Sequence, residues 1–157
     1  MDSEGFACLL SGYVVYLPHI QNNMTWDYVS AFLDTDGSIC LAKQAKHSEP
    51  TIQISFHNSY IELINALKEF IEKETGFIGS VSVKKKKKLN HLDSYDLKYT
   101  GVRRAYELSK KLKLLHPIKS KKIKLAKLLV QVTPRNGKYT EEQFKMREEL
   151  IQQFQSL

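Results

Sequence analysis

The sequence has little cysteine, and its histidines are scattered. The 157 residues include 2 cysteines, Cys8 and Cys40, which form no CxxC pair, and 5 histidines without the spacing of a zinc site. Neither a disulfide framework nor a structural metal is therefore expected to hold the fold together. A reducing compartment inside the cell suits such a chain.

Long hydrophobic runs are missing too. The apolar stretch at residues 6–18, FACLLSGYVVYLP, is too short to span a bilayer. Asp2 and Glu4 precede it, and residues 1–24 contain no Lys or Arg, so no secretory signal or ordinary transit peptide is indicated. We interpret residues 1–24 as an N-terminal appendage of unknown role. We expect an intracellular protein, located in a mitochondrion or chloroplast if an organelle encodes it.

Positive charge is what the sequence has in excess. There are 24 Lys and Arg against 17 Asp and Glu, a formal net charge of +7, and every Lys and Arg lies after residue 24. This excess points to a polyanionic partner, either nucleic acid or an acidic membrane surface. With 42% apolar and 26% charged residues, residues 25–157 are expected to fold as a single domain.

Hydrophobic periodicity predicts helices and β-hairpins in alternation. In the first helix Thr25 suits the N-cap and Gly37 the C-cap, and Gly76 stops the second. The predicted elements are a helix at 25–36, strands at 38–46 and 51–58, a helix at 60–75, strands at 77–88 and 94–100, and helices at 102–115, 118–132 and 140–154. This order predicts an α+β fold with an αββαββα core and additional C-terminal helices.

The sequence Asp34-Thr35-Asp36-Gly37 ends the first helix and is compatible with several chemistries. A haloacid-dehalogenase-like phosphatase needs a doubly wound parallel sheet and a downstream acidic pair, and this chain offers hairpins and no adjacent Asp-Asp. An EF-hand loop needs six spaced ligands ending in Glu, which do not follow Asp36. Two interpretations remain: the acids hold a cation at the negative end of the helix dipole, or they are solvated before a turn.

The run Val29-Ser30-Ala31-Phe32-Leu33-Asp34-Thr35-Asp36-Gly37 resembles the LAGLIDADG motif, and the order of helices and hairpins over residues 25 to 135 is similar to that of the LAGLIDADG homing endonucleases. The resemblance implies a site-specific, intron-encoded endonuclease that cuts both strands of a roughly palindromic DNA site. One copy of the motif implies a homodimer in which the motif helices pack about a two-fold axis. The predicted dimer interface consists of Val29, Ser30, Ala31 and Leu33.

The resemblance also assigns roles in catalysis. Asp36 is expected to ligate Mg²⁺ with the backbone carbonyl of Thr35 beside it, and Asp34 to brace the helix end. The family carries a lysine close to the scissile phosphates, near the start of the helix that follows the proline break. Lys122 is the expected counterpart because it keeps the spacing from the proline, and Lys121 is the alternative.

One position departs from the family pattern. Where the family commonly has a polar residue, often Gln, that organises the catalytic water, this chain has Tyr60. The departure favours an alternative function on the same fold, either a non-catalytic RNA maturase or a DNA-binding regulator. A generic basic RNA-binding domain, which would be a monomer, is a further alternative.

Polar side chains alternate along the predicted hairpins and would form a DNA-reading face, because a two-stranded ribbon fits the major groove. Gln44 and Gln53 suit adenine, whereas the lysine run that begins at Lys84 suits phosphates. The predicted residues that contact double-stranded DNA are Gln44, Lys46, Thr51, Gln53, Ser55, His57, Ser82, Lys84, Lys86 and Lys98.

Overall fold

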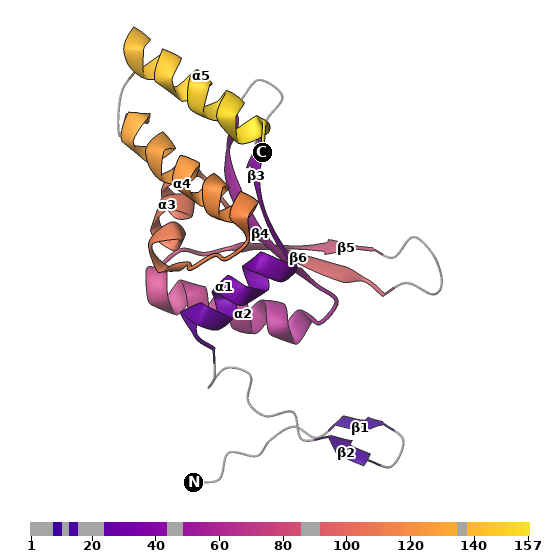
Figure 1. Cartoon of the computed structure of the whole chain (residues 1–157). Coiled ribbons are helices and arrows are strands. Elements are labelled where there is room, and N and C mark those ends of the chain that lie inside the picture. Colours follow the sequence, from indigo (N-terminus) through magenta and orange to yellow (C-terminus); the bar gives the residue numbers. More distant parts are fainter. Residues whose placement is uncertain (1–7, 11–12, 16–23, 44–48, 86–91, 135–137) are drawn as a thin grey trace.

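The α+β prediction is confirmed by a computed structural model of the chain, which describes residues 8–10, 13–15, 24–43, 49–85, 92–134 and 138–157 (Figure 1). The elements of the domain are α1 (Trp26–Thr35), β3 (Gly37–Ala42), β4 (Thr51–Asn58), α2 (Ile61–Thr75), β5 (Ser80–Lys84), β6 (Ser94–Thr100), α3 (Val102–Lys111), α4 (Pro117–Val132) and α5 (Glu141–Gln155). They occur in the predicted order.

The predicted appendage contains two short strands. β1 (Cys8–Leu10) and β2 (Tyr13–Val15) pair antiparallel as a separate sheet. Met24 is buried with the core of the domain, at the boundary drawn from the sequence. Over the described ranges, no helix has the length and apolar content needed to cross a bilayer.

Thr25 and Gly37 lie at the two ends of α1. The role of Thr25 is as predicted, and that of Gly37 differs from the prediction. Thr25 is the N-cap, and its hydroxyl accepts a hydrogen bond from the Tyr28 amide at 3.2 Å. Gly37 is not the C-cap: Asp36 holds that position, and Gly37 begins β3. Glycine is required there for space, since a Cβ would lie 2.7 Å from the Leu33 Cα. By contrast Gly76, with φ of 73°, ends α2 as predicted.

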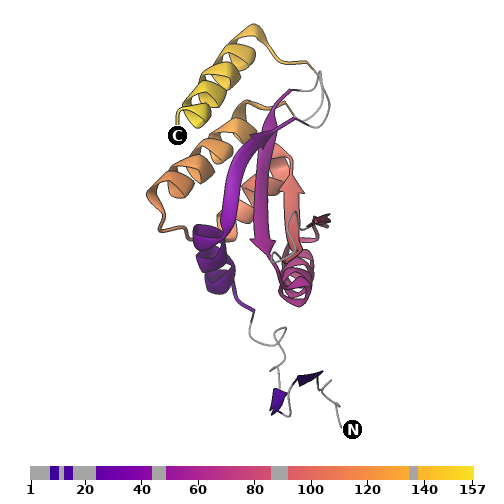
Figure 2. The same ribbon diagram turned by 90° about the vertical axis from the view of Figure 1, so that its right-hand side faces the viewer.

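The sheet has one apolar and one polar face. Its strands run in the order β3-β4-β6-β5, and all neighbours are antiparallel. Alternation turns Ile52, Ile54 and Phe56 of β4 toward the helices, where all three are fully buried. The helices gather on this side of the sheet, and α3, α4 and α5 lie side by side (Figure 2). The opposite face carries the polar residues of the hairpins.

The last helix is attached to the first hairpin by a buried arginine. α5 begins with a capping box formed by Thr140 and Gln143. The Arg147 guanidinium, with its side chain 6% exposed, donates to a Glu49 carboxylate oxygen at 2.8 Å and to the Pro50 carbonyl at 2.9 Å. These contacts connect α5 to the segment that leads into β4.

Candidate active site and nucleic-acid interface

The C-terminal end of α1 presents a carboxylate to solvent. Asp36 caps the helix through its amide, which donates to the Phe32 carbonyl at 3.0 Å, and its side chain is exposed. The Thr35 hydroxyl donates back to the carbonyls of Ala31 and Phe32 at 3.1 and 3.2 Å. The threonine side chain is therefore used within the helix, and the Asp36 carboxylate projects from its end.

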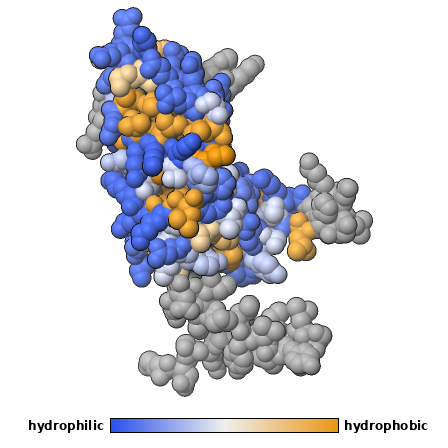
Figure 3. Space-filling model, in the orientation of Figure 1, coloured by the Kyte–Doolittle hydropathy of each residue, from blue (hydrophilic) through white to orange (hydrophobic). Residues whose placement is uncertain are grey.

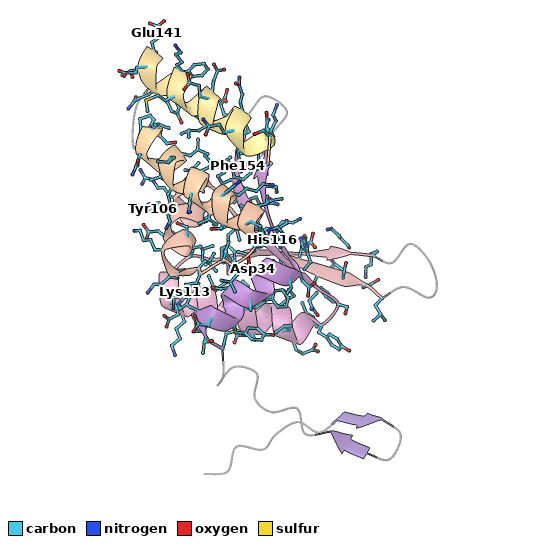
Figure 4. All side chains as sticks on the ribbon, viewed as in Figure 1. Asp34, Tyr106, Lys113, His116, Glu141 and Phe154 are labelled. Atoms are coloured by element: carbon cyan, nitrogen blue, oxygen red, sulfur yellow. The ribbon has the colours of Figure 1, made fainter. Side chains whose placement is uncertain are left out.

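Asp34 binds the segment between α3 and α4. Its two carboxylate oxygens accept from the backbone amides of Leu115, at 2.6 Å, and His116, at 3.3 Å. Figure 4 shows Asp34 at the end of α1 beside His116, at the start of α4. Charge-assisted bonds of this kind are stronger than bonds between neutral groups. Asp34 thus has the bracing position that the sequence suggested.

Lys119, in the first turn of α4, reaches back to the end of α1. Its ammonium donates to the carbonyls of Leu33 and Asp34, both at 2.8 Å, and of Thr35 at 3.4 Å. These carbonyls belong to the last turn of the helix, where they lack partners within the helix. Burial lowers the pKa of Lys119, and the charges of Asp34 and Asp36 oppose this shift. The ammonium is therefore within electrostatic range of both carboxylates, while its hydrogen bonds go to the backbone.

The oxygen atoms at this end of α1 are of the kind that bind a divalent cation, but they are too few to fill its coordination shell. A carboxylate and a backbone carbonyl are the hard ligands that Mg²⁺ prefers. Asp36 is accessible, whereas the Thr35 carbonyl is shared with Lys119. Within the part of the chain that the structure describes, no three His, Cys, Asp or Glu side chains gather as a metal site.

A chain of hydrogen bonds crosses the polar face of the sheet. The hydroxyls of Ser38 and Ser55 lie 2.8 Å apart, Ser55 Oγ lies 3.4 Å from His57 Nε2, and His57 Nδ1 lies 2.6 Å from Asp96 Oδ1. This order of Ser, His and Asp is that of a nucleophilic triad. However, Ser55 is only 1% exposed and already bonded to Ser38, so a substrate has no access to its hydroxyl. The arrangement instead fixes the side chains of this face.

Asp96 is a buried acid surrounded by cations. Its side chain is 2% exposed, and Oδ2 forms ion pairs with the ammonium groups of Lys84 at 2.8 Å and Lys98 at 3.4 Å. Burial alone would raise the pKa of Asp96. The hydrogen bonds and charges of Lys84 and His57 outweigh burial and lower that pKa from 3.8 to about 2. Asp96 is therefore ionised at neutral pH.

Comparison with known proteins identifies the fold. No family model matches the chain, and no curated protein matches its sequence. A crystal structure of the homing endonuclease I-CvuI with its target, in the presence of calcium, is 15% identical with a TM-score of 0.56, over 88% of this chain and 83% of that one. A second I-CvuI structure, with the I-CreI target uncleaved in the presence of magnesium, is 13% identical with a TM-score of 0.55, over 83% and 80%.

The chain has the LAGLIDADG homing endonuclease fold. Both the motif run that ends in Asp36 and the succession of helices and hairpins predicted this fold, and it is confirmed. At these identities the likeness establishes the arrangement of the chain. The roles of individual residues follow from the contacts and burial of their side chains in this structure.

The DNA-binding candidates among the described residues share the polar face of the sheet. They are Thr51, Gln53, Ser55 and His57 on β4, Ser82 and Lys84 on β5, and Lys98 on β6. Ser55, being buried, is placed to act through its neighbours rather than directly. Gln44, Lys46 and Lys86 lie outside the described residues.

The predicted dimer interface needs correction. Val29 and Leu33 are fully buried in the core of their own subunit, and Ser30 is 3% exposed. Ser30 Oγ donates to the Trp26 carbonyl at 2.6 Å and accepts from the Lys113 amide at 3.0 Å. Of the four predicted residues, only Ala31 is exposed. The segment after α3 contacts this side of α1, where the amides of Lys113, Leu115 and His116 donate to the side chains of Ser30 and Asp34.

The exposed side of α1 is formed by other residues. Tyr28, 43% exposed, lies beside Ala31, and Leu115, 91% exposed, contributes from the segment before α4. A shallow depression is lined by Asp27, Ser30, Ala31, Asp34, Lys113 and Leu115. Figure 3 shows apolar side chains gathered here and along α4.

The two predicted lysines lie further along α4 than Lys119. The Lys122 ammonium lies 5.4 Å from the centre of the Phe154 ring of α5. Lys121 is exposed and lines a pocket with Gln153 and Ser156. The lysine that contacts the end of α1 is Lys119, which was not singled out from the sequence, and the roles of Lys122 and Lys121 stay predictions. The available signal for Lys119 was its place in the first turn of α4, where a cation opposes that helix's own dipole and needs another partner.

Tyr60 stands at the position of the water-organising residue expected from the resemblance. It is the N-cap residue of α2, and its amide donates to the Asn58 side-chain oxygen at 2.9 Å. Its side chain is 68% exposed. The aromatic ring is thus accessible at the end of β4.

Replacing Lys119 tests its contact with α1. We expect Lys119→Met to lower the free energy of unfolding by about 1–2 kcal/mol, because three carbonyls lose their charged donor. Lys121→Met, at an exposed position of the same helix, should change it by less than about 0.5 kcal/mol. Urea denaturation measures both values. Equal effects of the two substitutions would contradict the assigned contact.

Low pH should remove the contribution of Asp96 to the free energy of unfolding. Because its pKa is lowered from 3.8 in the unfolded chain to about 2 in the folded one, the stabilisation is complete above about pH 4 and is lost as pH falls toward 2. The difference in unfolding free energy between the wild type and Asp96→Asn should shrink by about 2 kcal/mol across this window. Urea titrations at several pH values measure it. A difference that does not change with pH would argue against the ion pairs.

Proposed function

We propose that the protein is a site-specific double-strand DNA endonuclease that uses a divalent metal ion and acts as a homodimer. One observation carries the proposal: the exposed Asp36 carboxylate ends α1 directly where β3 begins. The acidic end of the helix and the polar sheet face are therefore joined without a linker. A DNA duplex on the sheet would bring its phosphates to Asp36.

The similar structures support a DNA partner and a divalent ion. The I-CvuI structures are complexes with DNA, one with its own target in the presence of calcium and one with the I-CreI target in the presence of magnesium. The polar face here combines hydroxyl, amide and ammonium groups, which suit base edges and phosphates. The net charge of +7 favours the same partner.

Hydrolysis of a phosphodiester needs an activated water, neutralised phosphate charge and a stabilised leaving oxygen, all of which a bound Mg²⁺ supplies. Asp36 and the Thr35 carbonyl are proposed to hold the ion. Lys119 donates its hydrogen bonds to backbone carbonyls at this end of α1, so its positive charge is close to the proposed ion site. Lys122 and Lys121, further along α4, are proposed to contact the phosphates near the cut.

Dimerisation would complete this site. One subunit offers a single accessible carboxylate at the end of α1, and a second copy related by a two-fold axis would offer another. The exposed residues Tyr28, Ala31 and Leu115 form the face on which the two copies of α1 are proposed to meet. The depression beside Ala31 leaves room for side chains of the second copy.

A non-catalytic function on the same fold is the second candidate. Tyr60 favours it, since an exposed phenol replaces the polar residue expected to organise water. Such a protein would be an RNA maturase that assists splicing, or a DNA-binding regulator. DNA that spans the insertion site of the proposed intron, with the intron removed, distinguishes the candidates. Mg²⁺-dependent cleavage of both strands supports the nuclease, and retention without cleavage supports the binder.

Asp36 is the residue on which cleavage should depend most. Asp36→Asn is expected to abolish Mg²⁺-dependent cleavage of the insertion-site DNA and to keep the wild-type affinity, because the amide is neutral but similar in shape. Glu148→Gln changes an exposed acid on α5, away from the end of α1, and should leave cleavage unchanged. Gel assays measure cleavage and retention separately. Cleavage by the Asp36 variant would remove this residue from the active site.

The dimer face can be tested at Ala31. We expect Ala31→Arg to convert a dimer to a monomer, because two-fold symmetry would place two buried charges near each other at the interface. Lys145→Arg, at an exposed position of α5, keeps its charge and should remain dimeric. Light scattering gives the mass of each. A monomeric wild type, or an Ala31→Arg dimer, would show that α1 does not form the interface.

A further inference from the structure

We propose that Asp96 is a positioning residue that sets the DNA specificity of the sheet, by holding the side chains of Lys84, Lys98 and His57 on its polar face and away from phosphates. This proposal rests on the proposed DNA-binding function. Asp96 itself, at 2% side-chain exposure, cannot reach a base. It acts through the three side chains that contact its carboxylate.

The contacts of Asp96 come from three strands. In the register of the sheet Asp96 faces His57 of β4 on one side and Ser82 of β5 on the other. The imidazole binds one carboxylate oxygen at 2.6 Å, and the lysine ammonium groups bind the other at 2.8 and 3.4 Å. Lys98 also donates to Ser82 Oγ at 3.1 Å. Side chains from β4, β5 and β6 are thereby fixed relative to one another.

A buried carboxylate competes with DNA for the same donors. Carboxylate and phosphate oxygens both accept charge-assisted hydrogen bonds from ammonium groups. Lys84, whose side chain is 61% exposed, would otherwise be free to follow any phosphate backbone. Contacts to phosphates give affinity without sequence information, whereas donors held in place can distinguish base edges. Asp96 is therefore expected to lower binding to generic DNA and raise discrimination.

The same hairpin contains a second ion pair, whose acid is more exposed than Asp96. Lys85 and Asp93 lie 3.3 Å apart, and their side chains are 83% and 30% exposed. Asp93→Asn changes the formal charge by the same amount as Asp96→Asn. Exposed pairs of this type contribute little energy. The control therefore separates the effect of one added positive charge from the release of the three held side chains.

The test compares wild type, Asp96→Asn and Asp93→Asn by fluorescence anisotropy on a random-sequence duplex over a range of salt concentrations. For Asp96→Asn we expect the slope of log affinity against log salt to steepen by about 1–2, which corresponds to one or two new phosphate contacts. Discrimination between random DNA and a duplex selected with the wild type should fall by about tenfold or more. Slopes and discrimination equal to those of Asp93→Asn would overturn the proposal.

A second variant keeps the test decisive if Asp96→Asn does not fold. Lys84→Gln alters an exposed side chain and should leave the salt slope on random DNA unchanged, because Asp96 already holds its ammonium. A slope shallower by about 1 would show that Lys84 contacts a phosphate, and the proposal would be wrong. A wild type that binds no duplex would overturn the proposed function and this inference together. Normal wild-type binding with unaffected Asp96 variants would overturn the inference alone.

Discussion

The C-terminal end of α1 and the N-terminal end of α4 provide hydrogen-bond partners for each other, and this pairing positions the rest of the site. Asp34, from the end of α1, accepts from amides just before α4, and Lys119, from the start of α4, donates to the last carbonyls of α1. Each helix thus supplies the charge that the other lacks. Because Asp34 is used in this exchange, Asp36 is left as the accessible acid of the pair.

The polar face of the sheet follows a similar rule, since its buried charge is compensated within the chain. Asp96 would be costly to bury alone, and it is tolerated because His57, Lys84 and Lys98 surround it. The acid at the end of α1 and the acid within the sheet therefore have opposite environments. The Asp36 carboxylate is open to solvent, where a cation can reach it. The Asp96 carboxylate is already paired with basic side chains, and it holds them in place.

The sequence was sufficient for features that depend on local chemistry. The helical cap at Thr25, the end of α2 at Gly76 and the alternation along β4 were all predicted, because each depends on a residue and its near neighbours. The motif at the end of α1 then indicated the fold. The roles of Gly37, Ser30 and Lys119 escaped prediction because they depend on approaches between segments far apart in the chain, as when Lys113 and Leu115 cover one side of α1.

The proposed symmetric site can be tested by selecting cleaved molecules from a randomised duplex library with Mg²⁺ and the wild-type protein. If two copies of α1 bring two Asp36 carboxylates to the centre of one DNA site, the selected duplexes should carry double-strand cuts at the centre of a sequence whose halves are related by two-fold symmetry. A library left uncut, or a recognised sequence without two-fold symmetry, would contradict the proposed dimeric endonuclease.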